Sequence, residues 1–216
     1  MTIVHHPADD LLLSYASGAA DEAVSLVVAT HLALCPVCRR AVAEMEAIGG
    51  AMLETGASVP LDGDALNSVL ARLDDATELP KTLRTVASGT PRLPEPLRSY
   101  VGGDFDAIRW SKIDSGIAVK RLMKIGDTRV HLIRSKPGHS AGTHTHSGEE
   151  HTLILAGGYT DVTGRYATGD LHSTTPDILH CPIADEGEDC IVLAVSDGPL
   201  KFRSFAVGLI GKWFGF

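Results

Sequence analysis

Hydrophobic residues in the first third of the chain recur with the period of an α-helix. Apolar positions three and four residues apart are interrupted at proline, glycine and acidic residues, which are the usual residues at helix ends. We therefore expect a small bundle of four helices: from Pro7 to Gly18, from about Asp21 to Leu34, from Pro36 to the Gly49-Gly50 pair, and a fourth that begins after Asp62 or Asp64.

Two of the predicted helices carry more apolar surface than so short a region can bury. The second helix is apolar almost all round, so it either faces a partner chain in part or lies centrally, wrapped by its neighbours. A long loop precedes the fourth helix, which leaves it free to dock on a partner. Its apolar side chains stand at i, i+3, i+4 and i+7: Leu66, Val69, Leu70 and Leu73.

The pattern changes in the middle of the chain. Residues 79–98 include four prolines with little hydrophobic periodicity, which is typical of a linker. Beyond them, short β-rich runs between Gly and Asp turns predict an antiparallel barrel or jelly roll, with strands at 117–125, 128–134, 152–156, 159–162 and 190–195. The expected fold is a multidomain α + β chain with a helical domain at 1–78 and a β domain at 99–216.

The distribution of charge restricts the partners of the chain. The net charge is −8, and residues 1–80, 81–98 and 99–216 contribute −9, +3 and −2. Binding to nucleic acid phosphates needs clustered Lys and Arg, so DNA is not the expected direct partner.

We see no signal peptide and no apolar run long enough for a membrane span, and four cysteines are too few for a disulfide framework. A cytoplasmic protein is expected.

A first group of metal-ligating residues lies at the junction of the second and third helices. His31, Cys35 and Cys38 are four and three residues apart, which directs all three side chains toward one point on a helix-turn backbone. Two thiolates and an imidazole suit tetrahedral Zn²⁺, which needs a fourth ligand. The candidates for that ligand are His6 first, then His5, then Asp9 or Asp10. Zinc here would staple a bundle too small to be comfortably stable alone.

These residues carry a family resemblance. His6 followed by His31-x-x-x-Cys35-x-x-Cys38, in an acidic helical segment, resembles the zinc-binding domain of bacterial anti-sigma factors. The resemblance implies that this domain clasps an ECF-type sigma factor and hides the surfaces with which it binds RNA polymerase. The acidity agrees with this, because sigma factors carry basic surfaces for DNA.

A second group of ligands lies in the β domain. Gly138, five residues, His144, one residue, His146, three residues, Glu150, six residues and Gly157 match the first motif of the cupin family at every anchor. The two histidines are two residues apart, so they point to the same face of a strand. Glu150, four residues after His146 and beyond a turn, is expected to point to that face too. Two imidazoles and a carboxylate bind a divalent transition metal.

The second cupin motif is looser. It is recognised in Tyr166-Ala167-Thr168-Gly169-Asp170 followed by His180, our choice for the third histidine ligand, with His172 as its rival. Ala167 replaces the usual proline, and Ala184 stands where asparagine is expected. The resemblance implies zinc in this site, although the same ligands accept Fe²⁺ or Mn²⁺.

The order of zinc domain, linker and cupin resembles the ChrR type of anti-sigma factor over almost the whole chain. The resemblance implies a regulator, not an enzyme, whose helical domain inhibits the sigma factor and whose cupin responds to singlet oxygen or organic peroxide. The alternative is a metal-dependent, dioxygenase-like cupin enzyme with an accessory zinc domain, in which Tyr159, Tyr166 or Glu149 would act as acid or base. A homodimer through the cupin domain is also kept open.

Overall fold

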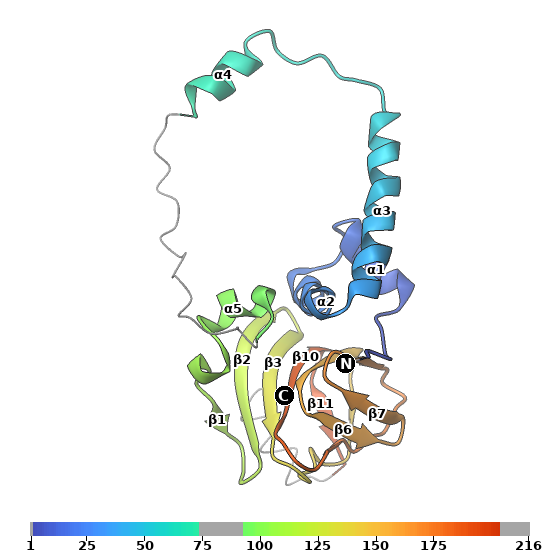
Figure 1. The fold of residues 1–216 in the computed structure, drawn as a ribbon, viewed down its shortest axis with the longest axis vertical. Coiled ribbons are helices and arrows are strands. Elements are labelled where there is room, and N and C mark those ends of the chain that lie inside the picture. Colours follow the sequence, from blue (N-terminus) through green and yellow to red (C-terminus); the bar gives the residue numbers. More distant parts are fainter. Residues whose placement is uncertain (1, 74–92, 204–216) are drawn as a thin grey trace.

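The computed structural model describes residues 2–73 and 93–203, in which helices precede a C-terminal set of antiparallel strands (Figure 1). One long helix rises from the body of the molecule and leads to a short helix that stands apart from it (Figure 1). The helices are α1 (Asp9–Ala16), α2 (Glu22–Leu34), α3 (Pro36–Glu54), α4 (Ala65–Ala71) and α5 (Glu95–Val101), with a 3₁₀ turn at Phe105–Ala107. No helix in these described ranges is long and apolar enough to cross a membrane.

Local capping explains where the first helices begin. The Asp21 carboxylate accepts a hydrogen bond from the Val24 amide at 2.8 Å and starts α2. Cys35 ends α2 and, followed by Pro36 at a position where proline suits a helix, caps α3. The predicted break at Gly49-Gly50 is wrong, because α3 continues to Glu54. A glycine costs a helix about 1 kcal/mol, which neighbouring helix-forming residues can offset.

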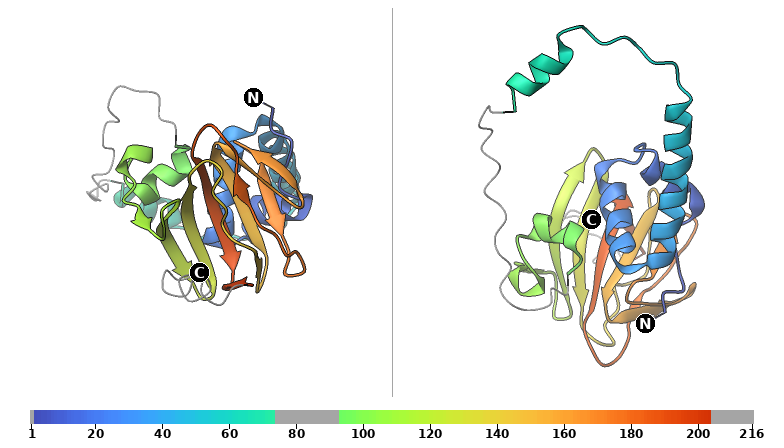
Figure 2. Two further views of the ribbon diagram at one scale, coloured as in Figure 1. Left: turned by 90° about the horizontal axis from the view of Figure 1, so that it is seen from below. Right: turned by 45° about the horizontal axis from the view of Figure 1, so that its top comes forward.

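The apolar helix α2 lies against the C-terminal strands. It contacts α1 and α3 on one side and β3, β5, β10 and α5 on the other, and the views in Figure 2 show it across one face of the sheet. A single cluster of buried side chains joins Val27 and Leu26 of α2 to Leu132, Leu153 and Leu193 of the strands. The second helix is thus covered by its own chain, which decides between the two sequence-based alternatives in favour of a central position.

The end of the predicted linker is ordered. Helix α5 begins at Glu95, and Leu93 and Leu97 are almost fully buried in the cluster shared with α2. The prediction of a linker is therefore wrong for residues 93–98, and residues 79–92 lie outside the described ranges. The prolines misled the prediction because Pro94 precedes the helix and Pro96 lies in its first turn, both positions that proline tolerates.

The strands form three antiparallel sheets, in the orders β1-β2-β3-β10-β5-β8, β11-β4 and β7-β6-β9. The five predicted strands correspond to β2, β3, β5, β6 and β10, with ends that differ by at most two residues. The bounds are β1 Ser111–Lys112, β2 Ile117–Ile125, β3 Thr128–Ser135, β4 His144–His146, β5 Glu150–Ala156, β6 Gly158–Asp161, β7 Gly164–Ala167, β8 Leu171–Thr174, β9 Ile183–Ala184, β10 Cys190–Asp197 and β11 Leu200–Phe202.

Strand β5 is buried on both faces of the largest sheet. Leu153 and Leu155 pack in the cluster shared with the helices, whereas Ile154 between them belongs to a second cluster with Tyr159 and Val192 inside the strand domain. Successive side chains of a strand point to opposite faces, so one strand serves both cores. The helical layer is therefore an integral cover of the sheet.

Candidate metal centres

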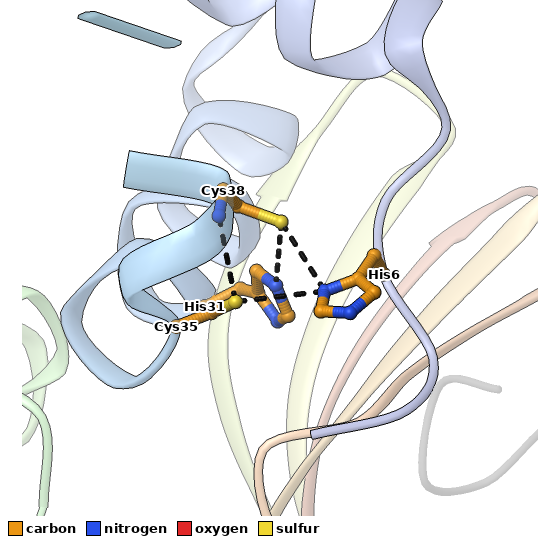
Figure 3. Close-up of side chains that lie close together, drawn as sticks. All are labelled: His6, His31, Cys35 and Cys38. Carbon is orange, nitrogen blue, oxygen red and sulfur yellow. Dashed lines mark hydrogen bonds between the residues drawn. The ribbon is translucent and has the colours of Figure 1, made fainter. Parts of the chain in front are cut away.

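The first metal-ligand cluster lies where α2 meets α3. His31 is in the last turn of α2, Cys35 is the residue between the helices, and Cys38 is in the first turn of α3. Figure 3 shows His6 approaching these three side chains from a separate segment of the chain. One donor atom from each of the four residues lies within 4.8 Å of the others.

The spacing of the four donor atoms suits a tetrahedral ion. His31 Nε2 is 3.3 Å from Cys38 Sγ, and His6 Nδ1 is 3.3 Å from Cys38 Sγ and 3.5 Å from Cys35 Sγ. With zinc bond lengths of about 2.0–2.3 Å, neighbouring ligand atoms of a tetrahedron lie about 3.5 Å apart. The cluster could hold zinc with little movement.

Burial sets the protonation of this cluster. The pKa of His31 falls to about 4, first because the ring is desolvated and then because His6 is close, while Gly169 and Asp170 oppose the shift. The imidazole is therefore neutral near pH 7, as a metal ligand must be. Desolvation raises the pKa of the Cys38 thiol to about 12, with Cys35 and Asp9 adding to the effect. A bound cation would be needed to favour the thiolate.

The structure separates His6 from its rivals. His6 faces both cysteines, whereas the ring of His5 packs on Tyr166 with centroids 4.5 Å apart. Asp9 and Asp10, the other candidates, open α1 and are exposed. His6 is thus the residue that joins His31 and the two cysteines.

The second cluster lies inside the strand domain. His144 and His146 are on β4, where their buried side chains share a face, and His144 forms an isolated β-bridge with His180. His180 Nε2 is 3.1 Å from His144 Nε2 and 3.0 Å from His146 Nε2. The structure therefore brings the three predicted histidines together with one nitrogen from each within 4.8 Å of the others.

Glu150 approaches the histidines from the start of β5. Its Oε2 is 3.5 Å from His146 Nε2, and the residue is buried. Desolvation raises the pKa of Glu150 to about 7, and a hydrogen bond with Thr152 partly offsets the rise. Desolvation is also the main reason why the pKa of His144 falls to about 4 and that of His146 to about 3. The imidazoles are neutral near pH 7 and can bind a divalent cation.

Two outer hydrogen bonds orient the imidazoles. The Nδ1 of His144 lies 2.8 Å from the Gly142 carbonyl, and the Nδ1 of His180 lies 2.8 Å from Asp161 Oδ2. Both oxygens accept, so each Nδ1 carries the proton and each Nε2 is free for a metal. The sequence analysis missed Asp161, which lies within the predicted strand 159–162 and ends β6, because it belongs to no recognised ligand motif.

His172, the rival of His180, is occupied by other partners. Its Nδ1 is 2.7 Å from the Tyr159 hydroxyl, its Nε2 is 3.1 Å from the Thr163 hydroxyl, and its ring stacks on Tyr166 at 4.0 Å. Its ring nitrogens therefore already have polar partners, while His180 joins His144 and His146. His172 also lies within ligand distance of Asp161 and His180, but His180 is the one that meets both His144 and His146.

A cavity of about 230 Å³ adjoins the second cluster. His144, Glu150 and His180 line it at one side, and most of the remaining wall is apolar, including Ile133 and Val192. Tyr159 also lines it, but desolvation and nearby acidic groups raise the pKa of this phenol well above its usual value. Tyr159 therefore remains protonated and is a poor general base near pH 7.

Known proteins resemble this chain both in the cupin region and over nearly its full length. Residues 99–201 match the ChrR cupin-like domain family. The anti-sigma-E factor ChrR of Cereibacter sphaeroides is 40% identical over 214 residues, which is 99% of each chain. A crystal structure of Rhodobacter sphaeroides SigE in complex with the anti-sigma ChrR contains a chain that is 39% identical. It matches with a TM-score of 0.80 and covers 91% of this chain and 100% of that one.

Proposed function

The chain belongs to the ChrR family of anti-sigma factors, which are regulators rather than enzymes, and from this premise we propose that it sequesters an ECF-type sigma factor. Inhibition would arise from steric masking of the sigma surface that binds RNA polymerase. This surface would be covered by the helical region, while the cupin at 99–216 would control release. The proposal places the complex in the cytoplasm, where transcription takes place.

The observation that carries the proposal is the apolar surface of the α3–α4 segment. No residue of α4 is buried, and Leu66, Val69 and Leu70 are between 49% and 69% exposed. Ile48 and Leu53 of α3 are exposed as well. An exposed helix with an apolar stripe is a typical docking element for a protein partner. The stripe predicted from the sequence thus lies where a sigma factor can reach it.

Charge favours a basic partner for the same region. The net charge of residues 1–80 is −9, and α1 begins with two exposed aspartates. A sigma factor presents basic surfaces toward DNA, and an acidic inhibitor speeds its capture by electrostatic steering. Association should therefore slow as salt concentration rises, because salt screens exposed charges over about 8–10 Å.

The experiment that tests the docking surface replaces its apolar residues by charges. Leu66→Asp combined with Leu70→Asp should abolish capture of the cognate sigma factor and restore its transcription in vitro. Neither change should unfold the protein, since α4 buries no residue. The matched control is Val162→Asp, at a 78% exposed position of the cupin, which should leave inhibition intact. Unchanged inhibition by the α4 variant would contradict the proposal.

We further propose that the first cluster holds structural zinc. His6, His31, Cys35 and Cys38 would complete a closed tetrahedral site, in which zinc stabilises the fold and carries out no reaction. The cupin cluster of His144, His146, His180 and Glu150 would hold a second divalent ion, zinc by resemblance to the family, although Fe²⁺ and Mn²⁺ accept the same ligands. A metal in this site would bind oxygen ligands as a Lewis acid.

The cupin would be the sensor for singlet oxygen or organic peroxide. The apolar cavity beside His144 and His180 supports this assignment, because it offers a small oxidant access to the metal ligands. His144→Ala should preserve sigma binding and abolish release when the complex is treated with an organic hydroperoxide. A variant that loses sigma binding as completely as the α4 variant would contradict this division of labour.

A further inference from the structure

The fourth ligand of the first cluster has a different origin from the other three. His31, Cys35 and Cys38 lie within eight consecutive residues on two connected helix ends, so local structure alone brings them together. His6 lies 25 residues before His31, in a segment without helix or strand. His6 is also exposed, so burial of its own side chain does not hold it in place. Its neighbours in the chain must position it.

Those neighbours are attached to the cupin by their backbone. We call residues 3–6 the N-terminal strap. The Val4 and His5 amides donate to Asp170 Oδ1 at 2.8 and 3.0 Å, and the His5 carbonyl accepts from the Leu171 amide at 3.0 Å. Three hydrogen bonds therefore fix the two residues directly before His6, and all three lead to Asp170 and Leu171. Figure 3 shows the segment that bears His6 continuing down to the cupin strands.

Side chains of the strap strengthen the attachment. Ile3 lies over Gly169, where an added Cβ would come within 2.7 Å of it, and Gly169 has a φ of 93°. The ring of His5 packs on Tyr166, as described above. By contrast, Val4 between them is 66% exposed. Alternate residues of the strap thus contact the cupin, as expected of an extended segment on a surface.

The buried Asp170 carboxylate accepts hydrogen bonds from backbone amides on both of its oxygens. It is only 4% exposed, and its second oxygen, Oδ2, accepts from the Ala167 amide at 2.9 Å. Burial alone would raise the pKa of Asp170, yet the amides of His5, Ala167 and Val4 lower it below its usual value. The carboxylate is therefore ionised and holds the strap on one side and its own turn on the other.

We infer that Asp170 is a positioning residue of the first metal centre. By holding the strap, this cupin carboxylate places His6 beside the three other ligands, His31, Cys35 and Cys38. Docking of the strap on the cupin then holds His6 from its N-terminal side, while buried Pro7 holds it from the other. A movement of the turn before β8 would loosen His6, and it would also reach His31, whose ring lies beside the Gly169 backbone. The inference rests on the proposed binding of metal at this cluster.

The test measures metal release from the first site of the full-length protein. Cobalt(II) loaded in place of zinc gives a thiolate-to-cobalt charge-transfer absorption, which the histidine and carboxylate ligands of the cupin site cannot produce. A chelator is added, and decay of this band reports release from the cysteine site alone. We expect Asp170→Ala to accelerate release about 10–100-fold, the range typical of residues that orient metal ligands, and nearly as far as His6→Ala does.

A double-mutant cycle separates positioning from general destabilisation. In the His6→Ala background, Asp170→Ala should cause no further acceleration, because the ligand that it positions is absent. Additive effects of the two substitutions would overturn the inference, and so would an unchanged release rate in Asp170→Ala. The matched control is Asp185→Ala, a cupin carboxylate that bonds Thr160 and Arg165 instead of the strap, and its release rate should equal that of the wild type.

A second pair of variants avoids any change to the cupin. Ile3→Ala should accelerate cobalt release, whereas Val4→Ala, one residue away but exposed, should not. Equal behaviour of the two variants would overturn the inference even if Asp170→Ala failed to fold. If the wild-type protein gave no thiolate-to-cobalt band, the proposed metal site would fail with the inference. A normal band that is insensitive to all strap variants would overturn the inference alone.

Discussion

The two metal-ligand clusters are assembled in different ways. In the first, three ligands come from adjoining helix ends and the fourth, exposed His6, follows a segment that is hydrogen-bonded to the cupin. In the second, the ligands His144, His146 and Glu150 stand on β4 and β5, and a β-bridge brings His180 to them. All four cupin residues are buried, whereas the first cluster has one exposed member.

This difference shows how the helical region that is proposed to bind the sigma factor can be linked to the cupin that is proposed to sense the oxidant. A cluster inside a barrel is fixed by the register of its strands, so its ligands are already oriented before an ion binds. A cluster at a junction depends on how two layers are docked. Because helices and sheet share one buried core, a change in the barrel can reach the junction through packed side chains. The following predictions test how independent the two centres are, beginning with the largest expected effect.

Loss of a thiolate should separate the two centres most strongly. Cys38→Ser should abolish metal binding at the first site and capture of the sigma factor, because structural zinc contributes on the order of 10 kcal/mol to small metal-stapled folds. The cupin should keep its metal, which elemental analysis of the dialysed protein would show. Cys181→Ser, a partly buried cysteine hydrogen-bonded to Ser140, is the matched control. Parallel loss of both metals would refute the independence of the cupin site.

An intermediate effect is expected from the carboxylate behind His180. Asp161→Asn removes the charge that accepts from His180 Nδ1 and should weaken metal binding at the cupin site about 10–100-fold. Competition with a chromogenic chelator measures this change. The first site should be unaffected, and Asp185→Asn should change neither site. Weaker binding at the cysteine site in the Asp161 variant would show that the centres are coupled more tightly than their geometry indicates.

The smallest effect concerns the exclusion of water from His131 in the largest sheet. Burial, with Arg121 and Arg129 nearby, lowers the pKa of His131 to about 4. Between pH 6.5 and 4 the unfolded chain binds a proton at this residue that the folded chain does not. The free energy of unfolding should therefore fall by about 1.4 kcal/mol for each pH unit of acidification, from this residue alone.

His131→Gln should remove this contribution and flatten the pH dependence by about that slope. Urea unfolding of wild type and variant between pH 7 and 4.5 measures the difference. Val162→Gln, at an exposed position without a titrating side chain, is the control and should leave the slope unchanged. Identical slopes for wild type and the His131 variant would show that water reaches this part of the sheet.

Much of the fold could be predicted because its signals are local. The helix that begins after Asp21 has its cap and its apolar run within consecutive residues, and the β-rich run at 117–125 matches β2 from end to end. Short strands such as β1, β9 and β11 were missed, since two or three residues have no period of their own. Helix α5 was missed because prolines in a first helical turn resemble a linker.

Some candidate ligands were likewise fixed by local spacing, and others only by tertiary contacts. The spacings His31-Cys35-Cys38 and His144-His146 fix side-chain directions within one strand or one helix junction, so the sequence by itself determined them. The choice of His6 over His5 and of His180 over His172 depends on strand bridges and on partners such as Tyr166 and Tyr159, which are far away in sequence.

The sequence determined the two ligand motifs, the acidity of the first 80 residues and the family to which they belong. Only the tertiary structure decided that α2 is buried against the β sheet, that Asp161 stands behind His180, and that Asp170 holds the segment leading to His6. The physical reason is the range of the interactions. Periodicity and capping act over a few residues, whereas packing and hydrogen bonds join residues up to 166 positions apart, and no local pattern records them.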